Sequence, residues 1–159
     1  MSYANIEAAQ QTLLRALATF SDDEVTRGDF KVLDLGKTVC CVLVPGPFSK
    51  RPRGGARDST VLWTTFVFVF QRSGDDPAAA LVSFQTTRQA VIDMYGAYPT
   101  LNHCGVGTFE TVELAVLEDG DEIMEIGSDA DQDSGPFFYL QILRVVITER
   151  VAASGGEYT

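Results

Sequence analysis

The stretch Val61–Gln71, Val-Leu-Trp-Thr-Thr-Phe-Val-Phe-Val-Phe-Gln, decides the fold of this chain. Side chains of a β-strand alternate between two faces, so odd and even positions lie on opposite sides. The odd positions carry Val61, Trp63, Val67 and Val69, and the even positions carry Leu62, Phe66, Phe68 and Phe70. Both faces of the strand are therefore apolar, which predicts that neither face meets bulk water.

Two amphipathic helices are available to cover one of these faces. The first is predicted from about Tyr3 to Phe20, where apolar residues recur at helical spacing. The second follows Asp75 and Asp76, either of which can cap it, places Pro77 in its first turn and ends near Gly96. One face of this helix is lined by Leu81, Phe84, Arg88, Val91, Ile92 and Tyr95. The remaining face of the strand needs another cover, and a neighbouring subunit is the natural one.

The remaining strands predict one α+β domain over residues 1–151, followed by a tail over residues 152–159. They are Phe30–Leu35, Thr38–Val44, Thr108–Leu117 with a bulge near Glu110–Thr111, an extension over Glu122–Ile126, and Phe137–Thr148. The last of these is again apolar on both faces. We expect an antiparallel or mixed β-sheet packed by two main α-helices, with a long loop between strands.

That long loop is predicted over residues 45–59, which hold three prolines and three glycines. It also carries a basic cluster, Lys50, Arg51, Arg53 and Arg57, that favours an acidic surface of a partner protein. A second predicted loop, residues 118–135, is strongly acidic and includes Asp129, Asp131 and Asp133. Loops of opposite charge can complement each other head-to-tail around a ring. The alternative is that both are solvated loops that keep the protein soluble.

Composition and motifs indicate no chemistry. The net charge of −10 argues against a surface built to grip nucleic acid, and no apolar run is long enough to span a membrane. Cys40, Cys41 and Cys104 form no disulfide framework and suggest a reducing compartment. His103 and Cys104 are adjacent, so in extended chain their side chains point apart rather than forming a nucleophilic pair. We therefore expect no enzyme activity, no catalytic residue and no cofactor.

One segment, Asp129–Gly135, places carboxylates on alternate residues like the start of a calcium loop. Its sixth position is Ser134 rather than glycine, and its twelfth is Leu140 rather than glutamate. A solvated acidic turn explains the same residues, and we predict no metal site.

Taken in order, these elements resemble the tail terminator (tail-completion) proteins of long-tailed bacteriophages and phage-like particles. The similar parts are the helix ending Leu13-Leu14-Arg15-Ala16-Leu17, the aromatic strand Trp63–Phe70 after a long loop, the Asp-capped helix with Leu81 and Arg88–Tyr95, the exit Tyr98-Pro99-Thr100-Leu101, and the strand from Pro136-Phe137-Phe138-Tyr139-Leu140-Gln141 to Glu149. The resemblance covers most of residues 3–150 and rests on organisation and common residue types. The acidic insertion around residues 119–133 is longer than the family's pattern.

The resemblance implies a structural virion protein that forms a hexameric ring at the head-proximal end of a viral tail. Such a ring caps the tail tube, joins it to neck or head-tail connector proteins, and assembles in the host cytoplasm. DNA passes through its lumen without specific binding, and no membrane is involved. A neck or head-completion connector and a non-viral cytosolic binding module are the alternatives. The candidate interface residues are Lys50, Arg51, Arg53, Arg57, Trp63, Phe66, Phe68, Phe70, Asp129, Asp131 and Asp133.

Overall fold

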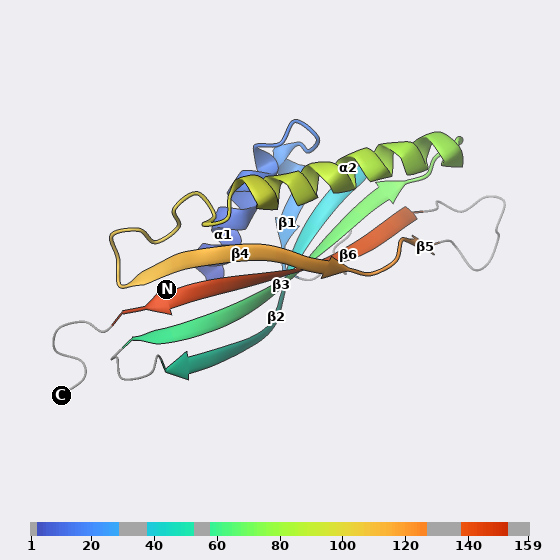
Figure 1. Cartoon of the computed structure of the whole chain (residues 1–159). Coiled ribbons are helices and arrows are strands. Elements are labelled where there is room, and N and C mark those ends of the chain that lie inside the picture. The colour runs from blue at the N-terminus through green and yellow to red at the C-terminus, as the bar shows by residue number, and fades with distance from the viewer. Residues whose placement is uncertain (1–2, 29–37, 53–57, 127–137, 153–159) are drawn as a thin grey trace.

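The computed structural model describes residues 3–28, 38–52, 58–126 and 138–152. In these residues two α-helices lie on one side of a six-stranded sheet (Figure 1), which confirms the predicted α+β class. The elements are α1 Tyr3–Arg15, the short 3-10 helix η1 Asp22–Glu24, β1 Val25–Arg27, β2 Val39–Pro52, β3 Ser59–Arg72, α2 Pro77–Ala97, β4 Glu110–Gly120, β5 Met124–Ile126 and β6 Phe138–Val151. No helix in the described ranges is long and apolar enough to cross a membrane.

The predicted two-faced strand is the centre of the sheet. The strand order is β1-β2-β3-β6-β4, with β5 also paired to β6. β3 pairs antiparallel with β6 from Ser59 opposite Val151 to Arg72 opposite Phe138, and β2 lies along its other edge. Among the strands of the described residues, the short β1 alone runs parallel to its neighbour, β2. A strand with partners on both edges is shielded sideways, and the helices cover one of its two faces, which explains the apolar residues on that face.

The helices cover the face formed by the odd positions of β3. Val67 and Val69 are fully buried there against Leu14 of α1 and Phe84 of α2. The second helix begins as predicted: the Asp76 carboxylate accepts a hydrogen bond from the Ala79 backbone N–H (3.1 Å), and Pro77 occupies the first turn.

A buried polar network fastens the two helices to the sheet. Gln10 of α1 is fully buried, and its Nε2 donates to the Thr65 hydroxyl of β3 (3.0 Å). The Tyr95 hydroxyl of α2 donates to Gln10 Oε1 (2.7 Å), and the Tyr3 hydroxyl is hydrogen-bonded to Thr65 (2.6 Å). Because each bond replaces water for a buried group, the network fixes where both helices sit on this face.

The predicted loop over residues 45–59 is wrong for most of its length. β2 continues to Pro52 and β3 already begins at Ser59. β2 tolerates its prolines because β1 pairs only with Cys41–Leu43, so no described strand flanks the outer edge of β2 beyond that point. The register shifts between Pro45 and Phe48, which places a bulge at Gly46-Pro47. Arg53 and Arg57 lie outside the described residues.

Other predicted boundaries also move. The α-helix of α1 ends at Arg15, although Phe20 is still buried. β4 continues to Gly120 and β5 pairs with β6, so the acidic segment begins inside the sheet rather than as a loop from residue 118. The irregularities of β4 fall after Val112 and after Leu117, not near residues 110–111. The predicted strand at residues 30–35 and the tail at residues 153–159 lie outside the described residues.

Candidate interaction surface

The face of the sheet opposite the helices is also apolar. We call it the open face, and it consists of the side chains that alternate with the helix-side core on four strands. From the registers these are Cys40, Val42 and Val44 of β2, Phe66, Phe68 and Phe70 of β3, Leu140, Ile142 and Val146 of β6, and Leu114 and Val116 of β4. Neither described helix packs on this face (Figure 1).

Burial on the open face is uneven. Cys40, Val42, Phe70 and Leu140 form a small buried cluster, with Phe68 half-buried beside it. Toward β4 the face is bare, since Leu114 and Val116 are 45% and 40% exposed. The side chain of Phe66 covers the bulge, because a Cβ on Gly46 would lie 2.8 Å from its Cε2 atom. A contiguous apolar area of this kind is typical of a surface that another protein covers.

Arg144 lies among these apolar side chains, between Ile142 and Val146 on β6. Arg144 of β6 donates from Nη2 to Glu118 Oε2 (2.6 Å) and lies 3.5 Å from Asp119 Oδ1 through its Nε. Both acids belong to the end of β4, so neighbouring strands neutralise the cation locally. The pairing leaves the centre of the open face without a free charge that would oppose burial.

Trp63 does not belong to the open face. It projects to the helix side, where its ring contacts those of Tyr3 and Phe48 at centroid distances of 5.4 and 5.1 Å. Its Nε1 donates to Oε1 of Glu149 (3.3 Å), which is 1% exposed and whose Oε2 has no hydrogen-bond partner among the described residues. Phe48 itself is 65% exposed, so an aromatic edge extends beyond the helices at this end.

The exposed cations of β2 and the carboxylate of Glu125 lie at opposite ends of the sheet. The end of β2 carries Lys50 and Arg51, which are both exposed and make no ion pair with any described residue. Glu125 of β5 lies beside the start of β6, opposite Tyr139. Of the β4 acids, Glu118 and Asp119 lie beside Arg144 in the middle of β6, and Glu110 is opposite Val151 at the end that carries Arg51. Arg51 is opposite Thr60, which is opposite Arg150 near the other end of β6. Eleven strand residues separate these positions, roughly 35 Å at about 3.3 Å per residue.

His103 and Cys104, the residues first considered for chemistry, lie in the segment between α2 and β4. His103 is exposed, and Leu101, Asn102 and His103 all have positive φ angles between 50° and 59°. Cys104 is half-buried, and burial together with the nearby Glu149 charge raises the pKa of its thiol. No group of metal-ligating side chains occurs in the ranges that the structure describes, and Asp129, Asp131 and Asp133 lie outside them.

The structure therefore divides the predicted interface residues. Phe66, Phe68 and Phe70 share the open face, Trp63 lies on the other side, and Lys50 and Arg51 lie at one end. Val112 does not share a face with Leu114 and Val116, because the register of β4 shifts between Val112 and Leu114. Val112 packs in the helix-side core, and only the other two extend the open face.

No known family model matches the chain, and no curated protein does. A search of solved structures finds a chain from the virion of a native gene transfer agent particle, with 15% sequence identity and a TM-score of 0.49. The match covers 96% of the present chain and all of the other.

Proposed function

We propose that this chain is a structural virion protein that forms a ring at the head-proximal end of a phage-like tail, as tail terminators do. The observation that carries the proposal is the open face. One side of the sheet is covered by α1 and α2, while on the other no described helix packs, and Leu114 and Val116 remain 45% and 40% exposed. Closed rings bury such faces at every subunit boundary.

The separated charges support the same proposal. The exposed Lys50 and Arg51 at one end of the sheet and the exposed Glu125 carboxylate at the other favour head-to-tail contacts, which close into a ring when the rotation between copies is right. The hexameric state, the contacts with tube and neck proteins, and a lumen that DNA crosses without specific binding follow from the resemblance of the sequence to tail terminators.

Cryo-electron microscopy of assembled particles tests the function. We expect density for this chain as a ring between tail tube and neck, with the open face or the strand edges of β2, β3 and β6 at subunit or tube contacts. A particle in which these strands touch neither another subunit nor the tube would overturn the proposal. A monomeric protein in solution would not, since a ring can close only on the end of a tail tube.

A further inference from the structure

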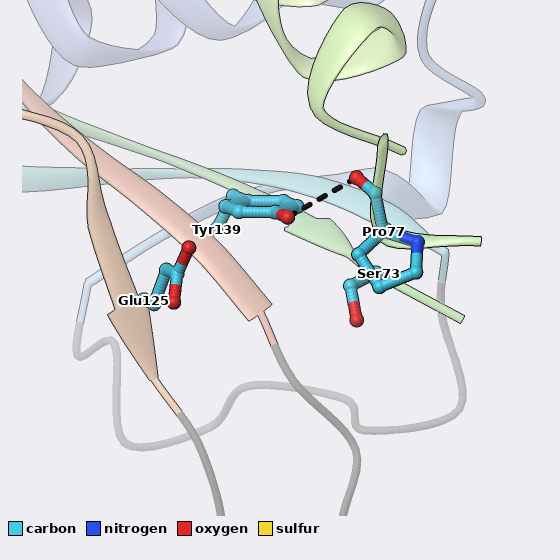
Figure 2. Close-up of a pocket in the computed structure, with 4 residues that line it drawn as sticks. All are labelled: Ser73, Pro77, Glu125 and Tyr139. Carbon is cyan, nitrogen blue, oxygen red and sulfur yellow. Dashed lines mark hydrogen bonds between the residues drawn. The ribbon is translucent and has the colours of Figure 1, made fainter. Parts of the chain in front are cut away.

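A small pocket lies on the helix side of the sheet, at the end where β6 begins. Its volume is about 190 Å³, and its described walls are Ser73, Pro77, Glu125 and Tyr139. Figure 2 shows Glu125 and Ser73 on opposite sides of the Tyr139 ring, with the Tyr139 hydroxyl turned toward Pro77. Ser73 directly follows β3, and the other three come from the start of α2, from β5 and from β6.

The polar groups of the pocket are mostly acceptors. Glu125 has an exposed carboxylate, which accepts hydrogen bonds. The Tyr139 hydroxyl donates its proton to the Pro77 carbonyl oxygen (3.1 Å), so toward the pocket it can only accept. Ser73 is 5% exposed, and its Oγ has no hydrogen-bond partner among the described residues. The nearest cation in sequence, Arg72, lies over the Phe138 ring, and alternation along the strands puts both on the other side of the sheet.

A buried hydroxyl without a partner is costly, because it has lost water and gained nothing in return. The pocket therefore fits a ligand with three properties. It donates a hydrogen bond to Ser73 Oγ, carries a positive charge toward Glu125, and has a flat surface that packs on the Tyr139 ring. The guanidinium group of arginine has these properties, since it is planar, always charged and presents five donors.

We propose that this pocket receives the Arg51 side chain of a second copy of the chain. The inference rests on the proposed ring, and it names one contact that would close it. Arg51 has no ion-pair partner among the described residues of its own chain, and it lies roughly 35 Å along the sheet from its own pocket. It can therefore fill only the pocket of a neighbour. Lys50 is the neighbouring residue, but its side chain points to the opposite face of β2. Its compact ammonium also lacks the planar, many-donor shape with which a guanidinium could bond Ser73 and Glu125 together.

Sedimentation equilibrium on the full chain tests this contact through a charge-swap cycle. Arg51→Glu and Glu125→Arg should each weaken self-association about tenfold or more, and the double variant should recover much of that loss. Lys50→Glu is the matched control at the neighbouring residue and should have a clearly smaller effect. Urea unfolding of each variant shows whether the fold is intact, and Ser73→Ala gives a variant that lacks only the unpartnered hydroxyl.

Ser73→Ala should weaken association several-fold while leaving the free energy of unfolding unchanged or slightly raised. The proposal is overturned if the two charge reversals act additively, if Lys50→Glu equals Arg51→Glu, or if the wild-type chain shows no self-association at any concentration. Each of these outcomes leaves the proposed ring testable, because the ring is judged by its density in the assembled particle.

Discussion

The two faces of the sheet are built from the same kinds of side chain but differ in how completely those side chains are buried. On β3, Val67 and Val69 are fully buried under the helices, whereas Phe66 and Phe68, between and beside them, are only partly covered. The helix side has a polar network through Gln10 and Thr65 that holds its cover in place. The open face has no such anchor in the described residues. Apolar sequence alone shows that a face needs a cover, and buried polar partners show which cover belongs to the same chain.

The sharpest way to break this comparison uses two adjacent residues of β4. Ala115 is 3% exposed in the helix-side core and Val116 is 40% exposed on the open face. Ala115→Asp should cost several kcal/mol, because an unpaired carboxylate in the core loses its hydration, and this approaches the total stability of a domain. Val116→Asp should change the free energy of unfolding by less than about 1 kcal/mol.

The same pair separates folding from assembly. Urea unfolding followed by circular dichroism measures the first, and incorporation into particles measures the second. We expect Val116→Asp to fold but fail to assemble. Normal incorporation of this variant would mean that the open face is not an interface, and a stably folded Ala115→Asp variant would mean that the helix-side core is assigned wrongly.

Local signals predicted the strongest elements well. β3 followed from alternation over eleven residues, and α2 followed from an aspartate cap with a proline in the first turn. Both patterns act within a few residues and need no knowledge of neighbours. The buried pair Gln10 and Thr65 was not predicted, because each residue is common on a solvated surface and only the packing of α1 on β3 brings them together.

The second half of β2 was missed for a non-local reason. A strand that is paired on both edges would be interrupted by prolines such as Pro45, Pro47 and Pro52. The outer edge of β2 is not paired with a described strand at these positions, so the strand can contain them. Which strand lies at the edge depends on the whole sheet order. The open face was predicted in part for the same reason: Phe66 and Phe68 follow from β3 alone, whereas Leu114 and Val116 depend on where β4 bulges.

Two glycines sharpen the comparison further. A Cβ on Gly120 would lie 2.7 Å from Leu143 Cδ2, in the helix-side core, and a Cβ on Gly46 would lie 2.8 Å from Phe66 Cε2 on the open face. Gly120→Ala should cost about 1–3 kcal/mol, because Leu143 has packed neighbours and little room to move. Gly46→Ala should cost less than about 1 kcal/mol, since the Phe66 ring can swing outward. Urea unfolding of both variants measures the difference, and equal costs would show that the open face is packed as tightly as the core.

The smallest expected effect concerns the alkaline limit of the helix side. Burial is the main reason that the pKa of Tyr3 rises from 10.0 to about 12, and its hydrogen bond with Thr65 opposes the shift only in part. Between these two values the unfolded chain has lost the Tyr3 proton and the folded chain still holds it. The folded state then binds more protons, so the free energy of unfolding must fall as the pH rises through this window. Below pH 10 the contribution is fully present.

Tyr3→Phe removes this titration together with the hydroxyl. At neutral pH the variant should be about 1 kcal/mol less stable, because Thr65 loses a hydrogen-bond partner. From pH 10 toward 12 the wild-type chain should lose about 1 kcal/mol more than the variant, an amount reduced by the partial exposure of Tyr3. The two stability curves, measured by urea unfolding across this range, should therefore converge. Some alkaline slope should remain in the variant, because burial also raises the pKa of Tyr95. Curves that stay parallel up to pH 12 would mean that the Tyr3 hydroxyl is open to water. The buried polar network of the helix side would then include Gln10, Thr65 and Tyr95 but not Tyr3.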